Sequence, residues 1–152
     1  MSKSKLSSRD QEIRLSIYKY LVETGIAPMA DTLASHFSVA EEEIASSFHR
    51  LASARALVLK PGTSVIWMAH PFSAVPTPYP VKTSRTTYYA NCAWDALGIP
   101  ALLHVDSLTE TDCPDCQEPL TIRVTGDRPT RCANVIHFAV APRHFWDDVG
   151  FT

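Results

Sequence analysis

The sequence predicts an α+β protein, with an N-terminal three-helix, winged-helix-like part followed by a small mixed β-sheet domain with short helices. Apolar residues recur at helical spacing in the first half, whereas β-branched and aromatic residues cluster in the second half. Four prolines between residues 71 and 80 separate the halves. We therefore expect a winged-helix-like domain at 1–70, a proline-rich linker at 71–85 and a C-terminal domain at 86–152.

Composition excludes several classes of protein. The chain has 152 residues, 45% hydrophobic and 20% charged, which is typical of a globular protein and not of a disordered one. We see no apolar run long enough to span a membrane and no signal peptide, so we expect no membrane partner and a cytoplasmic location. The net charge of −2 disfavours a strongly basic nucleic-acid-binding protein.

The first predicted helix is expected to begin near Ser8 or Asp10, which are candidate caps, and to end at Gly25. Its apolar positions recur every three or four residues, as expected for a helix with one buried face. This stripe consists of Ile13, Ile17, Tyr20, Leu21 and Thr24.

Two shorter helices are expected next. After Pro28, a helix would bury Leu33 and Phe37. Ser38 is then expected to cap a third helix, because Glu41 follows at capping-box spacing. The buried stripe of the third helix would be Ile44, Phe48 and Leu51.

The remaining elements are short. A β-hairpin is expected from residues 56–59 and 65–68 around a turn at 61–63, which completes the outline of a winged helix. Residues 91–97 are expected to form one or two helical turns that end at Gly98 and Pro100. The best candidate strands of the second half are 86–90, 120–124 and 135–140.

A winged helix raises the question of DNA binding, and the charges argue against it. A recognition helix needs basic and amide side chains that reach bases and phosphates. The third predicted helix instead opens with Glu41, Glu42 and Glu43, and residues 1–60 hold eight Lys or Arg against seven Asp or Glu. DNA is therefore an unlikely partner, and a helical scaffold that packs on the second half is the favoured interpretation.

The four cysteines, Cys92, Cys113, Cys116 and Cys132, all lie in the second half. In a reducing cytoplasm such a set more often indicates metal or thiol chemistry than disulfides. Cys113 and Cys116 form a CxxC motif, which is half of a typical zinc site. Zinc at this motif and an ordinary turn that carries two reduced thiols are both compatible with the spacing.

Cys92 and Asp95 lie three residues apart, so in a helix their side chains would share one face. A carboxylate beside a thiolate repels it, and each group is then expected to hold its proton more tightly. Such a pair suits a site in which a soft cation takes the thiolate and the carboxylate keeps a proton. A buried cysteine beside a helix-capping aspartate is the alternative, and spacing alone favours this alternative.

Three ordered segments resemble the organomercurial (alkylmercury) lyase family, and are MerB-like. Residues 89–103, with the motif CAWDALGIPAL, are similar to the family's signature C-A-x-D-x-L-x-x-P-A-L. Residues 111–124 resemble its cysteine-containing loop and following strand, and residues 132–142 resemble the strand of its second catalytic cysteine. The resemblance covers roughly residues 86–148, and three landmarks in order are more specific than one motif.

The resemblance implies that Cys92, Asp95 and Cys132 are catalytic. Cys92 and Cys132 would hold mercury, and Asp95 would protonate the carbon, so that R–Hg⁺ yields RH and bound Hg(II). The implied partners are an organomercurial substrate and small thiols that remove the product, with no cofactor required. The chain departs from the family in its second loop cysteine, Cys116, and in ending short of the usual C-terminal extension. Completion of the core by another subunit, and thus an oligomer, is one interpretation of the short C-terminus.

Two further functions stay open on sequence alone. One is a non-catalytic thiol module that binds zinc or a soft metal, in which Cys113 and Cys116 provide an additional metal or thiol site. The other is a metal-sensing winged-helix regulator, which would bind DNA in a salt-dependent manner.

Overall fold

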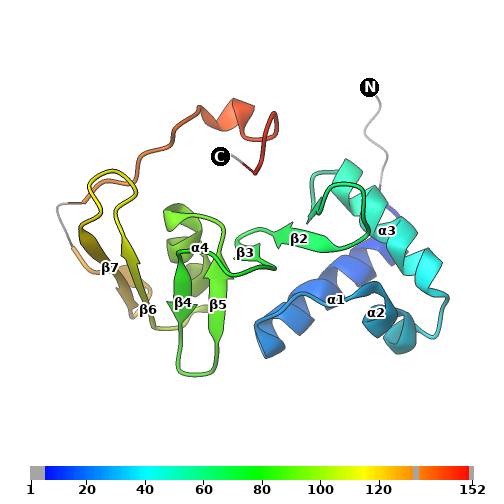
Figure 1. The fold of residues 1–152 in the computed structure, drawn as a ribbon. Helices are drawn as coiled ribbons and strands as arrows, with labels where there is room; N and C mark the ends of the chain where they lie inside the picture. Colours follow the sequence, from blue (N-terminus) through cyan, green and yellow to red (C-terminus); the bar gives the residue numbers. More distant parts are fainter. Residues whose placement is uncertain (1–5, 132–133, 151–152) are drawn as a thin grey trace.

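The computed structural model describes residues 6–131 and 134–150 and shows an α+β fold. Three helices lie at one end, and a sheet extends from them across the molecule (Figure 1). Within the described part of the chain, this sheet has eight strands in the order β1-β2-β3-β5-β4-β6-β7-β8. Each of these strand pairs is antiparallel, so the expected mixed sheet is wrong. Short connections explain the pairs of consecutive strands, because parallel neighbours need long crossovers, whereas β3 with β5 and β4 with β6 are pairs of non-consecutive strands.

Helix α1 (Ser8–Thr24) begins with a complete capping box. Ser7, and not the predicted Ser8 or Asp10, is the N-cap residue; Asp10 accepts hydrogen bonds from both the Ser7 backbone N–H and the Ser7 hydroxyl. The helix ends at Gly25 as predicted, because Gly25 adopts the left-handed conformation with a φ of 79°. Its predicted stripe is confirmed in part, since the fully buried positions are Ile13, Ile17 and Leu21.

Helices α2 (Ala30–Phe37) and α3 (Glu41–Ser53) complete the helical part. The prediction that Ser38 caps α3 is wrong: Ser38 is left-handed and ends α2, whereas Ala40 precedes α3 without a side-chain cap. The link between the helices is only three residues long, so Ser38, which follows directly after α2, ends that helix, and Ala40 takes the position before α3. The predicted stripe of α3 is confirmed, because Ile44, Phe48 and Leu51 are fully buried.

The expected hairpin is present. Strands β1 (Val58–Leu59) and β2 (Ile66–Ala69) pair antiparallel, and β2 then pairs with β3 (Phe72–Ser73). The helices and the sheet share one hydrophobic core, because a single cluster of buried residues includes side chains from α1–α3 and from β2, β3 and β5. The helical part and the sheet are therefore packed as one body.

The proline-rich segment 71–85 differs from the expected linker, because it contributes two strands. Strand β3 lies within it, and β4 (Pro80–Lys82) pairs with both β5 (Thr87–Ala90) and β6. Phe72 and Val81 are buried, and this burial holds the segment in the sheet. Pro80 stands at the first residue of β4, a position where a missing N–H is tolerated.

Helix α4 (Ala93–Leu103) follows β5 and runs past its expected end at Gly98 and Pro100. Ile99 and Pro100 are buried, and α4 packs against β4, β5 and β7. Gly98 faces the Pro71 ring, and a Cβ atom at Gly98 would lie 3.4 Å from the Pro71 Cβ. Tertiary packing on the sheet therefore outweighs the local tendency of glycine and proline to end a helix.

Strand β6 (Ser107–Asp112), which the sequence analysis did not identify, pairs along its length with β7 (Pro119–Thr125), which confirms the predicted strand at 120–124. The two-residue β8 (Arg128–Pro129) ends the sheet. The strand expected at 135–140 is wrong: the described residues of this range are irregular, and Val135 is 87% exposed. Alternating apolar residues form a strand only beside a partner, and the adjacent β8 is too short to provide one.

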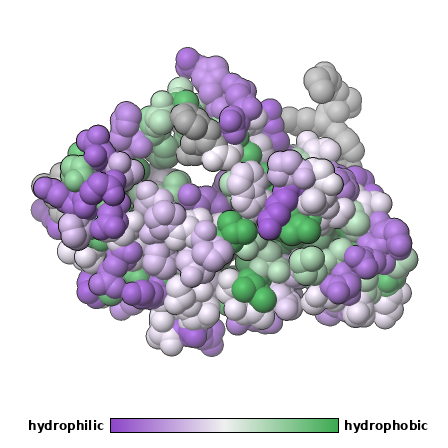
Figure 2. Space-filling view, viewed as in Figure 1, coloured by the Kyte–Doolittle hydropathy of each residue, from purple (hydrophilic) through white to green (hydrophobic). Residues whose placement is uncertain are grey.

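Residues 134–150, here called the C-terminal arm, cross back over the sheet and include the short 3-10 helix η1 (Pro142–His144). The arm arches from the β7 end of the sheet towards the helical part (Figure 1). In the space-filling view an opening lies beneath the arm (Figure 2). Among the described residues, no helix combines the length and the hydropathy that crossing a membrane requires.

Candidate active site

The junction between β5 and α4 positions Cys92 and Asp95. Cys92 is the extended N-cap residue of α4, and its carbonyl accepts the Ala96 N–H at 3.0 Å. Asp95 lies in the first turn of the helix, where a carboxylate is favoured by the helix dipole. Both side chains line the same cavity, with Cys92 at the N-cap position just before the helix and Asp95 inside the helix.

The Cys92 thiol is half-buried. Burial raises its pKa above the ordinary value, and the negative charge of Asp95 acts in the same direction, whereas the backbone N–H groups of Asp95 and Trp94 lower it. The net effect is to favour the neutral thiol.

Asp95 is held by neighbours from two segments. The Asn91 amide donates to Asp95 Oδ2 at 2.9 Å and to the Pro71 carbonyl at 3.1 Å. The imidazole Nδ1 of His70 lies 3.7 Å from the same Oδ2 and 3.3 Å from the Asn91 amide nitrogen. The Asp95 side chain is 16% exposed, so the carboxylate lies in a shielded position at the cavity wall. Asn91 thereby fixes one carboxylate oxygen and leaves the other available.

The cavity beside Cys92 and Asp95 has a volume of about 310 Å³. Four aromatic side chains line it, two of which pack as Trp94 edge-on to Phe138 with centroids 6.0 Å apart. Aromatic walls suit an apolar organic group, and the thiol and carboxyl supply the few polar groups that would orient it. The aromatic side chains are Trp94, Phe138, Phe145 and Trp146.

The third predicted catalytic residue, Cys132, lies outside the described residues. Its pairing with Cys92 therefore stays a prediction from the resemblance.

The CxxC motif lies in the loop between β6 and β7. The loop is closed by hydrogen bonds from the Cys113 N–H to the Glu118 carbonyl, at 2.8 Å, and from the Gln117 N–H to the Cys113 carbonyl, at 2.9 Å. The backbone N–H groups of Cys116 and Asp115 and the Cys116 thiol donate to the Cys113 sulfur and lower the pKa of Cys113. Both thiols are free, with Cys113 half-buried and Cys116 exposed.

A second, larger cavity, of about 770 Å³, lies on the other side of the α4 N-terminus. Cys113 lines it, as does Ala93, the residue after Cys92. Tyr79 lines it too; burial raises the pKa of Tyr79, and the charges of Cys92 and Cys113 add to that effect. The Tyr79 hydroxyl is therefore electrostatically coupled to both cysteines.

No group of three or more His, Cys, Asp or Glu side chains in 6–131 and 134–150 is arranged to hold a metal ion. Within that part of the chain, Cys113 and Cys116 thus lack the further ligands of a tetrahedral zinc site. Zinc at this motif stays a prediction.

Sequence analysis missed His70 and Asn91. Asn91 precedes Asp95 by four residues, and this spacing is a local signal that was available. His70 lies 25 positions before Asp95 in the chain, and only the pairing of β2, β3 and β5 brings the two together. No local pattern predicts such a contact.

Comparison with known proteins identifies the family of the chain. The family model described as MerB, alkylmercury lyase, matches residues 72–152, which is more than half of the chain. The chain belongs to the alkylmercury lyase family. The match covers β3 to the end of the chain, and thus includes Cys92, Asp95, both CxxC cysteines and Cys132. No significant match was found among curated proteins.

One solved structure, described as the mercury-bound form of MerB2, shares the fold with a TM-score of 0.66 and 21% sequence identity. The similarity covers 84% of this chain and 61% of that one, so the present chain spans less than two thirds of the length of that lyase relative. The 84% coverage extends beyond the 81 residues of the family match into the N-terminal half.

Proposed function

We propose that this alkylmercury lyase family member cleaves carbon–mercury bonds by protonolysis, with Cys92 and Cys132 as mercury ligands and Asp95 as the proton donor. The observation that carries the proposal is the placement of Cys92 and Asp95 in one aromatic-lined cavity. Family membership supports the same assignment, because both residues fall on the family signature.

The first step is capture of R–Hg⁺ by Cys92. The neutral thiol gives up its proton as the Hg–S bond forms, and the Asp95 carboxylate, which lines the same cavity, is proposed as the base that takes it. Asp95 therefore becomes a carboxylic acid in the step that binds the substrate. Thiolate sulfur is a preferred ligand for soft cations, which drives this exchange.

The second step breaks the Hg–C bond. A second thiolate, proposed as Cys132, raises the electron density on mercury, and the Hg–C electron pair takes the proton from Asp95. The products are RH and Hg(II) on sulfur, and Asp95 returns to its carboxylate form. Because Asn91 holds one Asp95 oxygen at 2.9 Å, the acid is oriented before the substrate arrives. Small thiols would then remove Hg(II).

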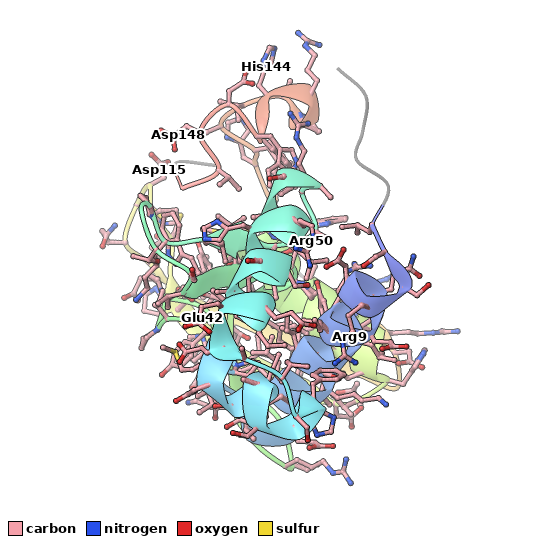
Figure 3. All side chains as sticks on the ribbon, turned by 90° about the vertical axis from the view of Figure 1, so that its right-hand side faces the viewer. Arg9, Glu42, Arg50, Asp115, His144 and Asp148 are labelled. Atoms are coloured by element: carbon pink, nitrogen blue, oxygen red, sulfur yellow. The ribbon has the colours of Figure 1, made fainter. Side chains whose placement is uncertain are left out.

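The helical part is proposed as a scaffold and not as a DNA-binding surface. Figure 3 shows α3 with Glu42 and Arg50 along it. Arg50 forms an ion pair with Asp10 of α1 at 2.8 Å, so one of the few cations of α3 is already neutralised within the protein. The first turn of α3 is acidic throughout, which opposes approach to phosphates.

The direct test is benzene release from phenylmercury by the purified chain in excess small thiol. We expect release by the wild type, loss in Cys92→Ser, Cys132→Ser and Asp95→Ala, and full activity in a matched control. The control is Asp31→Ala, which removes an exposed carboxylate in the first turn of α2. Absence of benzene from folded wild-type protein would contradict the proposal and favour a non-catalytic thiol module.

A further inference from the structure

We propose that Cys113 and Cys116 form a second, dithiol site that binds Hg(II), next to the Cys92 cavity. The site would receive the ion left behind by carbon–mercury cleavage, and this source of the ion rests on the proposed function. The binding itself does not rest on it, because the two sulfurs would take Hg(II) from any small-thiol complex.

The two cysteines lie three residues apart in the one turn between β6 and β7. The neighbouring Cys116 also lowers the pKa of the Cys113 thiol. Two backbone hydrogen bonds close the loop, and the Gln117 side chain adds a third by donating to the Cys113 carbonyl at 3.1 Å. Both thiols are free, and the exposure of Cys116 gives solvent-borne complexes access to the pair. A preformed dithiol of this kind chelates one soft ion through both sulfurs.

The dithiol also lies beside the proposed catalytic thiol. The larger cavity is lined by Cys113 at one wall and by Ala93, the residue that follows Cys92, at another. Tyr79 lies in the same lining and is close enough to both Cys92 and Cys113 to be affected by the charge of each. The dithiol would therefore lie close to an ion that leaves Cys92.

The number of sulfur ligands at this site favours Hg(II) over zinc. Zinc in structural sites takes four ligands, and in the described residues no further His, Cys, Asp or Glu completes the pair into a group of three. Hg(II) is satisfied by two thiolates, because it prefers two-coordinate sulfur complexes. A two-sulfur site is therefore complete for Hg(II) and incomplete for zinc.

Transfer to the dithiol is an exchange of ligands without oxidation or reduction. Each Hg–S bond that forms to Cys113 or Cys116 replaces one Hg–S bond to the delivering thiolate. The thiol proton released at Cys113 or Cys116 passes to the sulfur that is freed. Charge, protons and sulfur–mercury bonds balance, so no further reactant is needed.

The test uses all 152 residues with Cys92→Ser and Cys132→Ser, called the background variant, so that Cys113 and Cys116 are its two remaining thiols. The protein is loaded with Hg(II), treated with excess glutathione, desalted and analysed for mercury per chain. We expect this background to retain one Hg(II), and we expect the retained mercury to be lost when Cys113→Ser or Cys116→Ser is added. Asp115→Asn, a control within the same loop, should retain the ion, and circular dichroism should show that each variant is folded.

Two results would overturn the proposal. One is a background variant that holds no more mercury than the chain with all four cysteines replaced by serine. The other is stoichiometric zinc that the pair retains against a chelator while releasing Hg(II) to glutathione. Benzene release is measured separately from mercury retention. If the wild type releases no benzene but the background variant retains mercury, the lyase function is contradicted and the dithiol site is still supported.

Discussion

Replacement of Asp10 by alanine should destabilise the fold, because Asp10 links the N-terminus of α1 to α3. The carboxylate is 1% exposed and accepts hydrogen bonds from Ser7, Ser47 and Arg50. Ser47 donates to Asp10 Oδ1 at 2.6 Å and is itself fully buried. The substitution therefore removes the Asp10 half of the capping box, a buried hydrogen bond and an ion pair together, while the Ser7 hydroxyl still accepts the backbone N–H of residue 10.

The expected cost follows from these three contacts. Leaving the buried Ser47 hydroxyl without its partner costs about 1–3 kcal/mol. Loss of the Asp10 half of the capping box costs up to about 1 kcal/mol, the scale of a helix cap. The ion pair contributes at most about 0.5–1 kcal/mol, because the Arg50 side chain is 47% exposed and solvent screens it. A total of about 3 kcal/mol corresponds to a decrease in Tm of about 6–12 °C.

Urea unfolding followed by circular dichroism measures this change in the free energy of unfolding. The matched control is Glu12→Ala, which removes an exposed carboxylate of the same helix that pairs with Arg9 at 3.4 Å; we expect a change below about 0.5 kcal/mol. Arg50 and the hydroxyl donors lower the Asp10 pKa below its ordinary value of 3.8, so its contribution is present above about pH 4 and is lost as the pH falls further. The reasoning is refuted if Asp10→Ala and Glu12→Ala cost the same, or if the difference between wild type and Asp10→Ala grows below pH 4.

Three further perturbations test other parts of the structure. Tyr88→Phe removes the hydrogen bond from the Tyr88 hydroxyl to the Val22 carbonyl at 2.7 Å, which joins β5 to α1, and should cost about 1 kcal/mol by thermal unfolding; an unchanged Tm would contradict this link. Burial raises the Cys92 pKa, so its alkylation rate, followed by peptide mass spectrometry, should still increase above pH 9, and a plateau below that pH would show an ordinary thiol. Asn91→Ala removes the hydrogen bond that holds the Asp95 carboxylate. We expect kcat for benzene release to fall about tenfold with little change in KM, because a misplaced catalytic group lowers the rate steeply. An unchanged kcat would show that Asn91 does not position Asp95.

The helical part was largely predictable, because its stripes depend on local periodicity. Ile13 and Ile17 of α1 and Phe48 of α3 are buried where helical spacing places them. Caps were less predictable, since a shift of one residue, from Ser8 to Ser7, decides which hydroxyl meets the N–H of Asp10. Local composition therefore indicates that a helix is present more securely than it indicates its ends.

The errors in the second half arise from tertiary packing. Gly98 and Pro100 favour a helix end locally, yet α4 continues because Ile99 and Pro100 bury against the sheet. Val135 begins a pattern typical of a strand, but no neighbouring strand is available to pair with it. Both outcomes depend on what lies opposite in space, which one sequence does not specify.

The candidate site was predictable in its reacting groups and not in their support. Cys92 and Asp95 are three residues apart across the start of α4, and this short separation brings them to one cavity. The approach of His70 to Asp95 depends on the order of strands in the sheet, and the aromatic wall depends on how the C-terminal arm folds back.

The most direct test of the central claim is the mass of the mercury adduct after a single turnover. One equivalent of phenylmercury is added to the wild type and to Asp95→Ala, and intact-protein mass spectrometry identifies what remains bound. Proton delivery by Asp95 predicts Hg(II) without the phenyl group on the wild type and intact phenylmercury on Asp95→Ala. Loss of the phenyl group from Asp95→Ala, at the wild-type rate, would contradict the account.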